Sequence, residues 1–391
     1  MGKKPGSQAN DYIQVIAVFR AMVALSEFEE LNMIRCIFNR GSLKVAASLT
    51  LALVPLGLSA APNVYVPAGE ADRVLVVDSA IDKVVRTIDG IANSHGLSAG
   101  PQGQRLYVGS LNQRAANQVP AKPAGMSEDE HLSHHAGGTN RKPVNISLSG
   151  QIGTAYQIDV SSEQIVRKID VPGAIHHTLI TRDGRYGVST HPVSGQISVV
   201  DLDSGTITAQ IATGSLPNYI VSDRDGSRIW VSNTGNNTVS EIDTGRWIVR
   251  RNMVVEQAPE HMVLSADESS LYVVANGSGQ VVEVELEAGE VVRRHPVGSD
   301  PHGIDVSDDG TQLFVAVKGD NRLAAIQLAT GVVRTLSLGP APYHLLAVRN
   351  TGKLYVASRR ESKLWVVGQR DLRLLGEIPI SGVGHQMAVI E

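Results

Sequence analysis

The sequence is poor in thiols, since Cys36 is the one cysteine among 391 residues. A single thiol excludes a disulfide framework, a cysteine-rich zinc site and an iron–sulfur cluster, each of which needs several cysteines. It also excludes a covalently attached c-type haem, because the C-x-x-C-H attachment motif has two. A metal site in this chain must therefore use histidine, methionine or carboxylate ligands.

Aromatic residues and net charge are scarce as well. Aromatic side chains make up 4% of the chain and the net charge is −4. Because nucleic-acid-binding proteins carry a basic face and often stack bases on aromatic rings, we expect no nucleic-acid partner. We also find no Ser–His–Asp elbow, no phosphate-binding glycine loop and no paired carboxylates of the kind that hydrolytic enzymes use.

Long apolar runs are missing too. The run at Val45–Leu58 is shorter than the roughly 20 residues that a membrane-spanning helix needs. Basic residues precede it and Ser59-Ala60-Ala61 follows it, which is the pattern of a secretory signal peptide. We therefore expect a true start at Met33, a non-native start plus signal peptide over residues 1–61, and a periplasmic mature chain with no membrane span. The alternative is an uncleaved N-terminal anchor. The basic residues are Arg35, Arg40 and Lys44.

A periodic unit fills residues 62–391. In its clearest copy, residues 300–339, four short apolar runs with alternating polarity are separated by turns such as Asp308-Asp309-Gly310. Alternation with a period of two predicts half-buried β-strands. The core of the second strand recurs every 41 or 42 residues, at Ile229, Leu271, Leu313 and Leu354. Four strands in about 40 residues predict a β-propeller.

The two ends of the repeat region complement each other. Residues 63–90 supply three strands without a first one, and His385–Glu391 supplies a lone first strand. We expect these segments to form one blade, with six complete blades between them. The predicted fold is therefore all-β, a seven-bladed β-propeller in which strand exchange between the termini closes one blade and removes free sheet edges.

The repeat has a recognisable sequence. The pattern P-H-G-I-x-V-S-x-D-G-x-x-L-[YF]-V, seen at residues 301–315, resembles the YVTN-type β-propeller repeat. The same superfamily contains the haem d1 propeller domain of cytochrome cd1 nitrite reductase and its stand-alone relatives. The resemblance covers nearly all of residues 62–391 and is specific for the fold, whereas a fold alone does not fix a function.

Histidines gather where each blade enters its first strand. Two positions vary there, and six of the seven blades place a histidine in one of them. Because these entries surround the central channel, we expect several imidazoles to face one axial point, where they could ligate copper, iron or zinc. The alternative is that each imidazole bonds a neighbouring carbonyl group. Blade by blade, the positions are His95-Gly96, His176-His177, Asn218-Tyr219, Glu260-His261, His302-Gly303, Tyr343-His344 and Gly384-His385.

An insertion at about residues 111–150 lengthens the first complete blade between its second and third strands. Strand directions alternate, so this insertion belongs to the same face as the histidines. Ser127 and Glu130 match a helix capping box, and three histidines follow at helical spacing. We expect a lid that adds ligands, although a polar loop with unliganded histidines fits as well. The lid residues are Met126, His131, His134 and His135.

The resemblance to d1 propellers implies a haem d1-like cofactor on that face. We expect His95 as its axial ligand, His302 and His344 on the distal side, and Arg114 and Arg359 paired with its carboxylates. Because the chain lacks C-x-x-C-H, it has no haem c for electron entry, and we do not expect it to reduce nitrite alone. A cofactor-binding or maturation role, or redox chemistry with a partner, fits better. A periplasmic c-type cytochrome or a cofactor-handling protein would fit.

Two other functions stay open. The first is a copper-binding propeller that uses the histidine and methionine side chains, since a ligand set without a thiol suits copper better than zinc. The second is a non-enzymatic YVTN-type binding or scaffold protein without a metal.

Two histidines remain outside these groups. His191 is expected on the histidine face, and His295 is expected on the surface of an outer strand.

Overall fold

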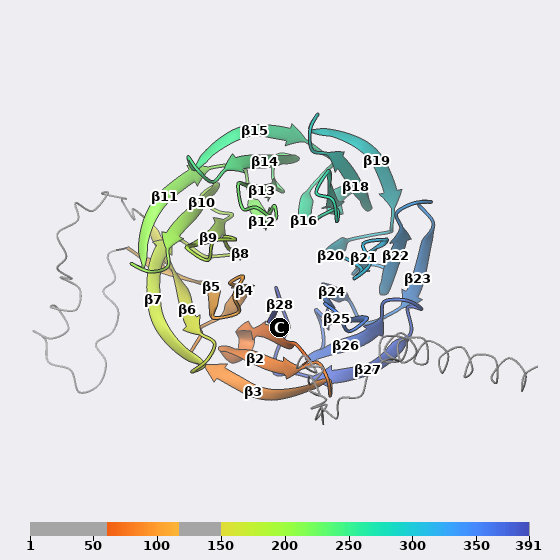
Figure 1. Cartoon of the computed structure of the whole chain (residues 1–391), viewed down its shortest axis with the longest axis horizontal. Coiled ribbons are helices and arrows are strands. Elements are labelled where there is room, and N and C mark those ends of the chain that lie inside the picture. Colours follow the sequence, from red (N-terminus) through yellow and green to blue (C-terminus); the bar gives the residue numbers. More distant parts are fainter. Residues whose placement is uncertain (1–60, 117–149, 391) are drawn as a thin grey trace, which may run out of the picture. The chain divides into compact units, whose positions relative to one another are not determined.

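A computed structural model describes residues 61–116 and 150–390, which belong to one compact unit. Seven antiparallel sheets of four strands each surround a central axis, as Figure 1 shows. Within the described ranges, the only helical elements are the short 3-10 segments η1 (Gly69–Ala71) and η2 (Asn276–Ser278). The prediction of an all-β, seven-bladed propeller is confirmed.

Each blade contributes one strand to each of four concentric positions. The innermost strands are β4 (Ser94–Ala99), β8 (Thr178–Ile180), β12 (Pro217–Ser222), β16 (Pro259–Leu264), β20 (Pro301–Val306), β24 (Pro342–Val348) and β28 (Ala388–Ile390). The second strands are β1 (Asn63–Ala68), β5 (Arg105–Ala115), β9 (Tyr186–His191), β13 (Arg228–Asn233), β17 (Ser270–Ala275), β21 (Gln312–Val317) and β25 (Lys353–Ser358).

The outer half of each blade follows the same order. The third strands are β2 (Arg73–Asp78), β6 (Gln151–Asp159), β10 (Gln196–Asp201), β14 (Thr238–Asp243), β18 (Gln280–Glu285), β22 (Arg322–Gln327) and β26 (Lys363–Gly368). The outermost strands are β3 (Lys83–Asp89), β7 (Gln164–Pro172), β11 (Thr206–Ala212), β15 (Ile248–Val254), β19 (Glu290–Pro296), β23 (Val333–Ser337) and β27 (Leu374–Pro379).

The hydrophobic core lies between neighbouring blades. One cluster joins Phe314 and Leu323 of one blade to Val356 and Trp365 of the next, and all four side chains are at most 2% exposed. Burial of one such large apolar side chain contributes about 1.5–3 kcal/mol. Because each strand alternates its side chains between the two faces of its sheet, every blade packs against both neighbours.

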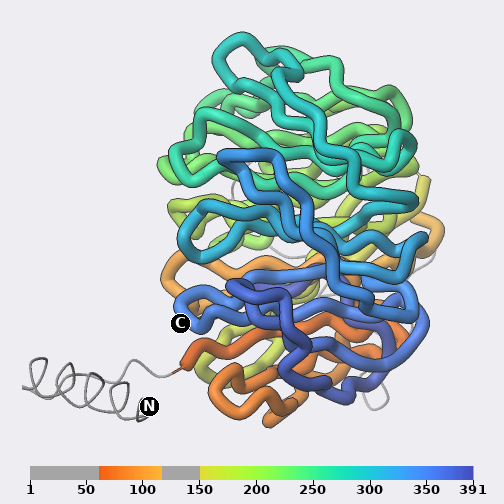
Figure 2. The backbone as a smooth tube through the Cα atoms, turned by 90° about the vertical axis from the view of Figure 1, so that its right-hand side faces the viewer, coloured from red at the N-terminus to blue at the C-terminus, as the bar shows by residue number. Residues whose placement is uncertain are grey.

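The two ends of the described chain meet in one sheet. β28 pairs antiparallel with β1, and the strand order in that sheet is β28-β1-β2-β3. Figure 2 shows the C-terminal segment in blue beside the first strands in orange. Met387, which precedes β28, packs with Val64 and Leu364 in the cluster between this blade and its neighbour. The closing strand is therefore bonded to the sheet and buried in the core.

A β-bulge marks the start of the innermost strands. In β20 the register shifts between Pro301 and Ile304, so that His302 and Gly303 lie opposite a single residue of β21. The same shift occurs in four other innermost strands, namely β4, β12, β16 and β24. A bulge bends the strand locally and redirects its side chains. The two variable positions of the repeat are the two bulged residues, which explains how their side chains leave the sheet for the axis.

In the closing blade, the two variable positions lie one residue later than the sequence alignment predicts. Gly384 forms a bridge to Ala68, as Ser94 pairs with Ser110 in the next blade. The variable positions of this blade are therefore His385 and Gln386, and not Gly384 and His385. The alignment was wrong because the apolar residue that ends the bulge is Met387, and the sequence carries no proline here to mark the start.

Candidate metal centre

Seven histidines meet at one end of the channel, and we refer to them as the histidine layer. All of them belong to the segments that begin the innermost strands. Their rings are in mutual contact, with centroids 4.1 Å apart for His95 and His385 and 5.9 Å apart for His95 and His344. His176 is partly buried and the other members are at most 7% exposed. The members are His95, His176, His177, His261, His302, His344 and His385.

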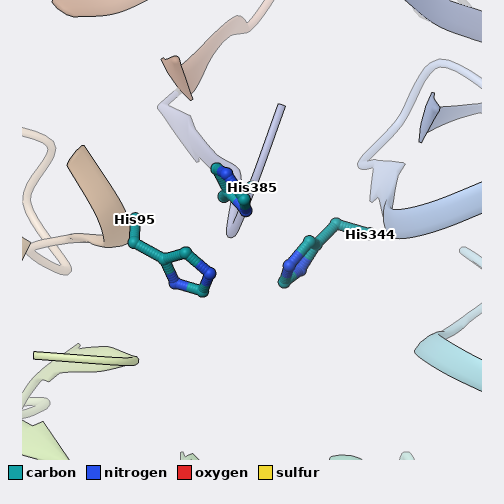
Figure 3. Close-up of side chains that lie close together, drawn as sticks. All are labelled: His95, His344 and His385. Carbon is teal, nitrogen blue, oxygen red and sulfur yellow. The ribbon is translucent and has the colours of Figure 1, made fainter. Parts of the chain in front are cut away.

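Two groups of three histidines are close enough to share a metal ion. The first is His95, His344 and His385, and the second is His177, His261 and His344. In each group the potential ligand atoms lie within 4.8 Å of one another. Figure 3 shows the first group, whose rings point toward one common space from three segments of the chain. An imidazole–metal bond of about 2.0 Å puts two nitrogens of a tetrahedral site about 3.3 Å apart, so small ring movements would complete either group.

Backbone carbonyl groups fix two of these rings. The Nδ1 atom of His95 lies 2.7 Å from the carbonyl oxygen of His176, and that of His177 lies 3.0 Å from the carbonyl oxygen of Asn218. A carbonyl oxygen can only accept, so Nδ1 carries the proton in both rings. In a neutral imidazole this leaves Nε2 with a free lone pair, which is how metal-ligating histidines are usually oriented.

Several nitrogens of the layer are buried without a hydrogen-bond partner among the described residues. A buried polar atom without a partner costs about 1–3 kcal/mol, and native proteins contain few of them. Their concentration at one point marks the layer as a place where a bound ligand could supply several partners together. The atoms are His176 Nδ1, His177 Nε2, His261 Nε2, His302 Nε2, His344 Nε2 and His385 Nδ1.

The layer is uncharged at neutral pH. Burial lowers the pKa of His176 to about 4 and that of His385 to about 3. Burial, followed by the neighbouring imidazoles, holds the pKa of His95 and His344 well below 6.5. Neutral imidazoles keep the lone pairs that a metal ion needs, whereas imidazolium rings would repel both the ion and each other.

A carboxyl group and two tyrosines support the layer. Nδ1 of His302 contacts a carboxylate oxygen of Glu260, and burial raises the pKa of Glu260 to about 7. Tyr343 stacks on His302 with centroids 4.1 Å apart, and Tyr219 stacks on His261 at 4.2 Å. A carboxylate behind an imidazole fixes the ring and raises its basicity as a ligand.

The opposite end of the channel is built differently. A cavity of about 490 Å³ is lined there by residues that follow the bulges, among them Ser98, Leu179 and Ser222. Gln386 lies between this cavity and the histidine layer. Its Oε1 accepts from the backbone N–H groups of Leu97 and Thr178, both at 3.1 Å. This side chain thereby ties the closing blade to the next two blades.

The structure brings some predicted residues to the layer and not others. The guanidinium of Arg359 lies 5.3 Å from the ring centroid of Tyr343, beside His302. Arg114 instead forms an ion pair with Asp170 of the outermost strand β7, at 2.6 Å. It lies in β5, which has 11 residues where β9, β13 and β17 have six, so the extra length of this blade begins as a continuation of the strand. Met126, His131, His134, His135 and the predicted signal segment lie outside the described residues.

Two further histidines are outside the layer. His191 is buried with both ring nitrogens bonded, Nδ1 to the carbonyl oxygen of Ala174 and Nε2 to the hydroxyl group of Ser198. His295 lies on the outermost strand β19, but the expectation of a surface side chain was wrong, because it is 3% exposed. The turn at Gly331 of the next blade passes beside its ring and covers it.

Sequence reasoning did not single out four supporting residues. Glu260, Tyr219 and Tyr343 occupy the same variable positions as the histidines, and Gln386 does so once the alignment is corrected. Their place in the repeat was a usable signal. The sequence did not reveal that Glu260, Tyr219 and Tyr343 contact imidazole rings, or that Gln386 bonds the backbone of two other blades.

Comparison with known proteins agrees with the fold. Residues 188–353 match the model of the YNCE-like beta-propeller family. No curated protein matches the chain at a significant level. Within the described ranges, we find no helix long and apolar enough to cross a membrane.

Solved structures extend the likeness to almost the whole propeller. Hydrazine synthase of Kuenenia stuttgartiensis is 17% identical, with a TM-score of 0.58 over 76% of this chain and 95% of that one. The periplasmic gluconolactonase PpgL of Pseudomonas aeruginosa is 17% identical, with a TM-score of 0.64 over 84% and 99%. The dihydro-heme d1 dehydrogenase NirN is 12% identical, with a TM-score of 0.57 over 81% and 63%. The expected likeness to d1-type propellers is thereby confirmed at the level of the fold.

Proposed function

We propose that this chain binds a transition-metal ion, with copper as the preferred ion, through the imidazoles of the histidine layer. The observation that carries the proposal is the pair of three-histidine groups. Their ligand nitrogens include buried atoms of His177, His261 and His344 that have no other partner. A metal ion would satisfy these atoms at once.

The chemistry of the ligands narrows the choice of metal. Magnesium and calcium prefer oxygen ligands, whereas imidazole suits copper, zinc, nickel and iron. Among divalent ions of the first transition row, copper binds nitrogen ligands most tightly. The described site holds imidazoles and the Glu260 carboxyl group, with no thiolate that would favour zinc or an iron–sulfur cluster.

A haem d1-like group is the second candidate, and the fold of NirN, solved in complex with DHE, favours it. The packing of the layer favours a bare ion. The unpartnered nitrogens are enclosed, and the rings of His95, His344 and His385 lie against one another. An ion fits between such rings, whereas a macrocycle would have to separate them before iron could reach a nitrogen. Of the layer, His95 is the residue we expect to ligate haem iron if the macrocycle binds.

The proposal places the protein in the periplasm. The signal-like sequence before Ala61 supports this location, as does the fold shared with a periplasmic gluconolactonase. In that compartment a buried copper site would serve redox chemistry or cofactor handling, with a c-type cytochrome or a cofactor-handling protein as partner.

Metal binding can be tested with tag-free protein that has been stripped with a chelator. The protein is titrated with Cu²⁺, desalted and analysed for copper by mass spectrometry, and its visible and electron paramagnetic resonance spectra are recorded. We expect copper to stay bound in the wild type and to be lost in His344→Ala. His295→Gln is the matched control, since it changes a buried histidine outside the layer and should retain copper.

Two results would contradict the proposal. The first is a wild-type protein that retains no more copper or zinc than the His344→Ala variant. The second is a haem titration in which the Soret band shifts in the wild type but not in His95→Ala, while Cu²⁺ does not bind. That outcome would assign the site to a haem.

A further inference from the structure

We infer that the histidine layer holds two metal ions, with His344 between them. This inference rests on the proposed metal binding and adds the number of ions and the ligands of each. In this arrangement His95 and His385 ligate one ion, and His177 and His261 ligate the other. The shared residue belongs to both three-histidine groups, which have no other member in common.

The number of imidazoles is larger than one ion can use. Even a six-coordinate site takes fewer ligands than the seven histidine rings in contact in the layer. An ion in the first group would leave Nε2 of His177 and Nε2 of His261 buried without a partner. An ion in the second group would leave Nδ1 of His385 in the same state. Two ions satisfy both groups.

His344 has neighbours from both groups. Its ring centroid lies 5.9 Å from that of His95 and 5.7 Å from that of His385. The centroids of His177 and His261 are 5.7 Å and 4.7 Å away. The shared imidazole can ligate either ion through one nitrogen. If it loses its N–H proton to solvent, it can ligate both.

Each group also has its own fixed ring. The carbonyl oxygen of His176 orients His95, and the carbonyl oxygen of Asn218 orients His177. In both rings the bonded Nδ1 leaves Nε2 as the ligand atom. Each group therefore contains one ring that is held with Nε2 available. The anchor of His95 is the residue before His177, so the two oriented rings are also coupled through the backbone.

The test counts copper ions per chain. Chelator-stripped, tag-free wild-type protein is titrated with Cu²⁺ alone, and bound copper is measured by mass spectrometry and by integrating the electron paramagnetic resonance signal. We expect two copper ions per chain, with a signal smaller than the total Cu²⁺ because neighbouring spins couple. His95→Gln and His177→Gln should each keep one ion, with a signal that accounts for all bound copper.

The outcomes separate this inference from the proposed function. No copper in the wild type would overturn both. One ion in the wild type, lost in both His95→Gln and His177→Gln, would overturn the two-ion inference and leave the metal site in place. Thermal melting and circular dichroism confirm that each variant is folded, and His295→Gln should bind two ions like the wild type.

Discussion

The two ends of the central channel use the same innermost strands in different ways. At one end, imidazole rings fill the axis and contact one another. At the other end, the same strands leave a cavity of about 490 Å³. The difference arises at the bulge, which in five of the innermost strands redirects two residues toward the axis, whereas the residues after it return to ordinary strand geometry. The same repeat therefore builds one end that is rich in imidazoles and one end that is open. The two variable positions at the bulge determine which side chains fill the first end.

The two ends also differ in how their polar groups are satisfied. Gln386, on the side of the cavity, has both ends of its amide bonded to the backbone of Leu97 and Thr178. In the histidine layer, ring nitrogens of most members have no partner. The polar group that closes the fold is bonded within the protein, whereas ring nitrogens that we propose as metal ligands have no partner among the described residues.

Removal of the closing segment should affect both ends and give the largest effect. Deletion of residues 385–391 removes His385 from the layer and Met387 from the core, along with the strand that pairs with β1. Because several buried side chains and ladder bonds are lost together, we expect a loss of several kcal/mol and a melting temperature lower by roughly 10 °C or more. Differential scanning calorimetry measures it. A melting temperature equal to that of the full chain would show that this strand does not close the ring.

The charge state of the layer should make metal-free protein less stable in mild acid. The folded-state pKa values are lowered, to about 4 for His176 and about 3 for His385, whereas unfolded histidine titrates near pH 6.5. As pH falls below about 6.5, the unfolded chain binds protons that the folded chain does not, so stability falls with pH by about 1.4 kcal/mol per unit for each such histidine.

Glu260 acts in the opposite direction, because its pKa is raised to about 7 and it favours the protonated form in the folded state. Because this one carboxyl group opposes several histidines, the free energy of unfolding should still fall as the pH is lowered from 6.5 to 5. Urea unfolding at several pH values measures how the free energy of unfolding changes with pH. His261→Gln should reduce this slope by about 1.4 kcal/mol per pH unit, which is the contribution of one proton. A stability that is unchanged between pH 7 and pH 5 would contradict the buried, neutral layer.

Removal of the Glu260 carboxylate should have the smallest effect of these changes. It tests whether polar groups at the histidine end, and not at the cavity end, influence copper affinity. Glu260→Gln keeps the shape but removes the carboxylate from His302. His302 is in neither three-histidine group, but its ring packs against the proposed ligand His261 with centroids 4.4 Å apart. We therefore expect copper affinity to fall by about 10-fold, the lower end of the range for groups that orient a ligand. Ser222→Ala, at the cavity end, is the matched control and should leave the affinity unchanged. Competition with a chelator of known affinity measures both. Equal affinities for the two variants would mean that Glu260 does not orient the layer.

The repeat made most of the fold predictable. The spacing of the cores from Ile229 to Leu354 identified the propeller, and the variable positions located the layer. The register failed by one residue at His385, where Gly384 replaces the usual proline. The burial of His295 depends on a turn of the next blade, and the ion pair of Arg114 with Asp170 depends on the exact length of β5, so neither follows from the repeat pattern. The free nitrogens depend on hydrogen bonds between blades, such as that from His177 to Asn218.

The tie formed by Gln386 has a consequence for biosynthesis. Its partner Leu97 lies 289 residues earlier in the sequence, so that bond joins the first complete blade to a segment that emerges after all the intervening blades. The histidine layer has the same property, since His95 and His385 contact each other. A nascent chain that stops before His385 has most of its sheets but an incomplete ligand set. Under the proposed two-ion arrangement, the group of His95, His344 and His385 would be completed only when the ring closes, whereas the group of His177, His261 and His344 does not need the last strand. Occupation of the first group would therefore report that the whole propeller has been made and assembled.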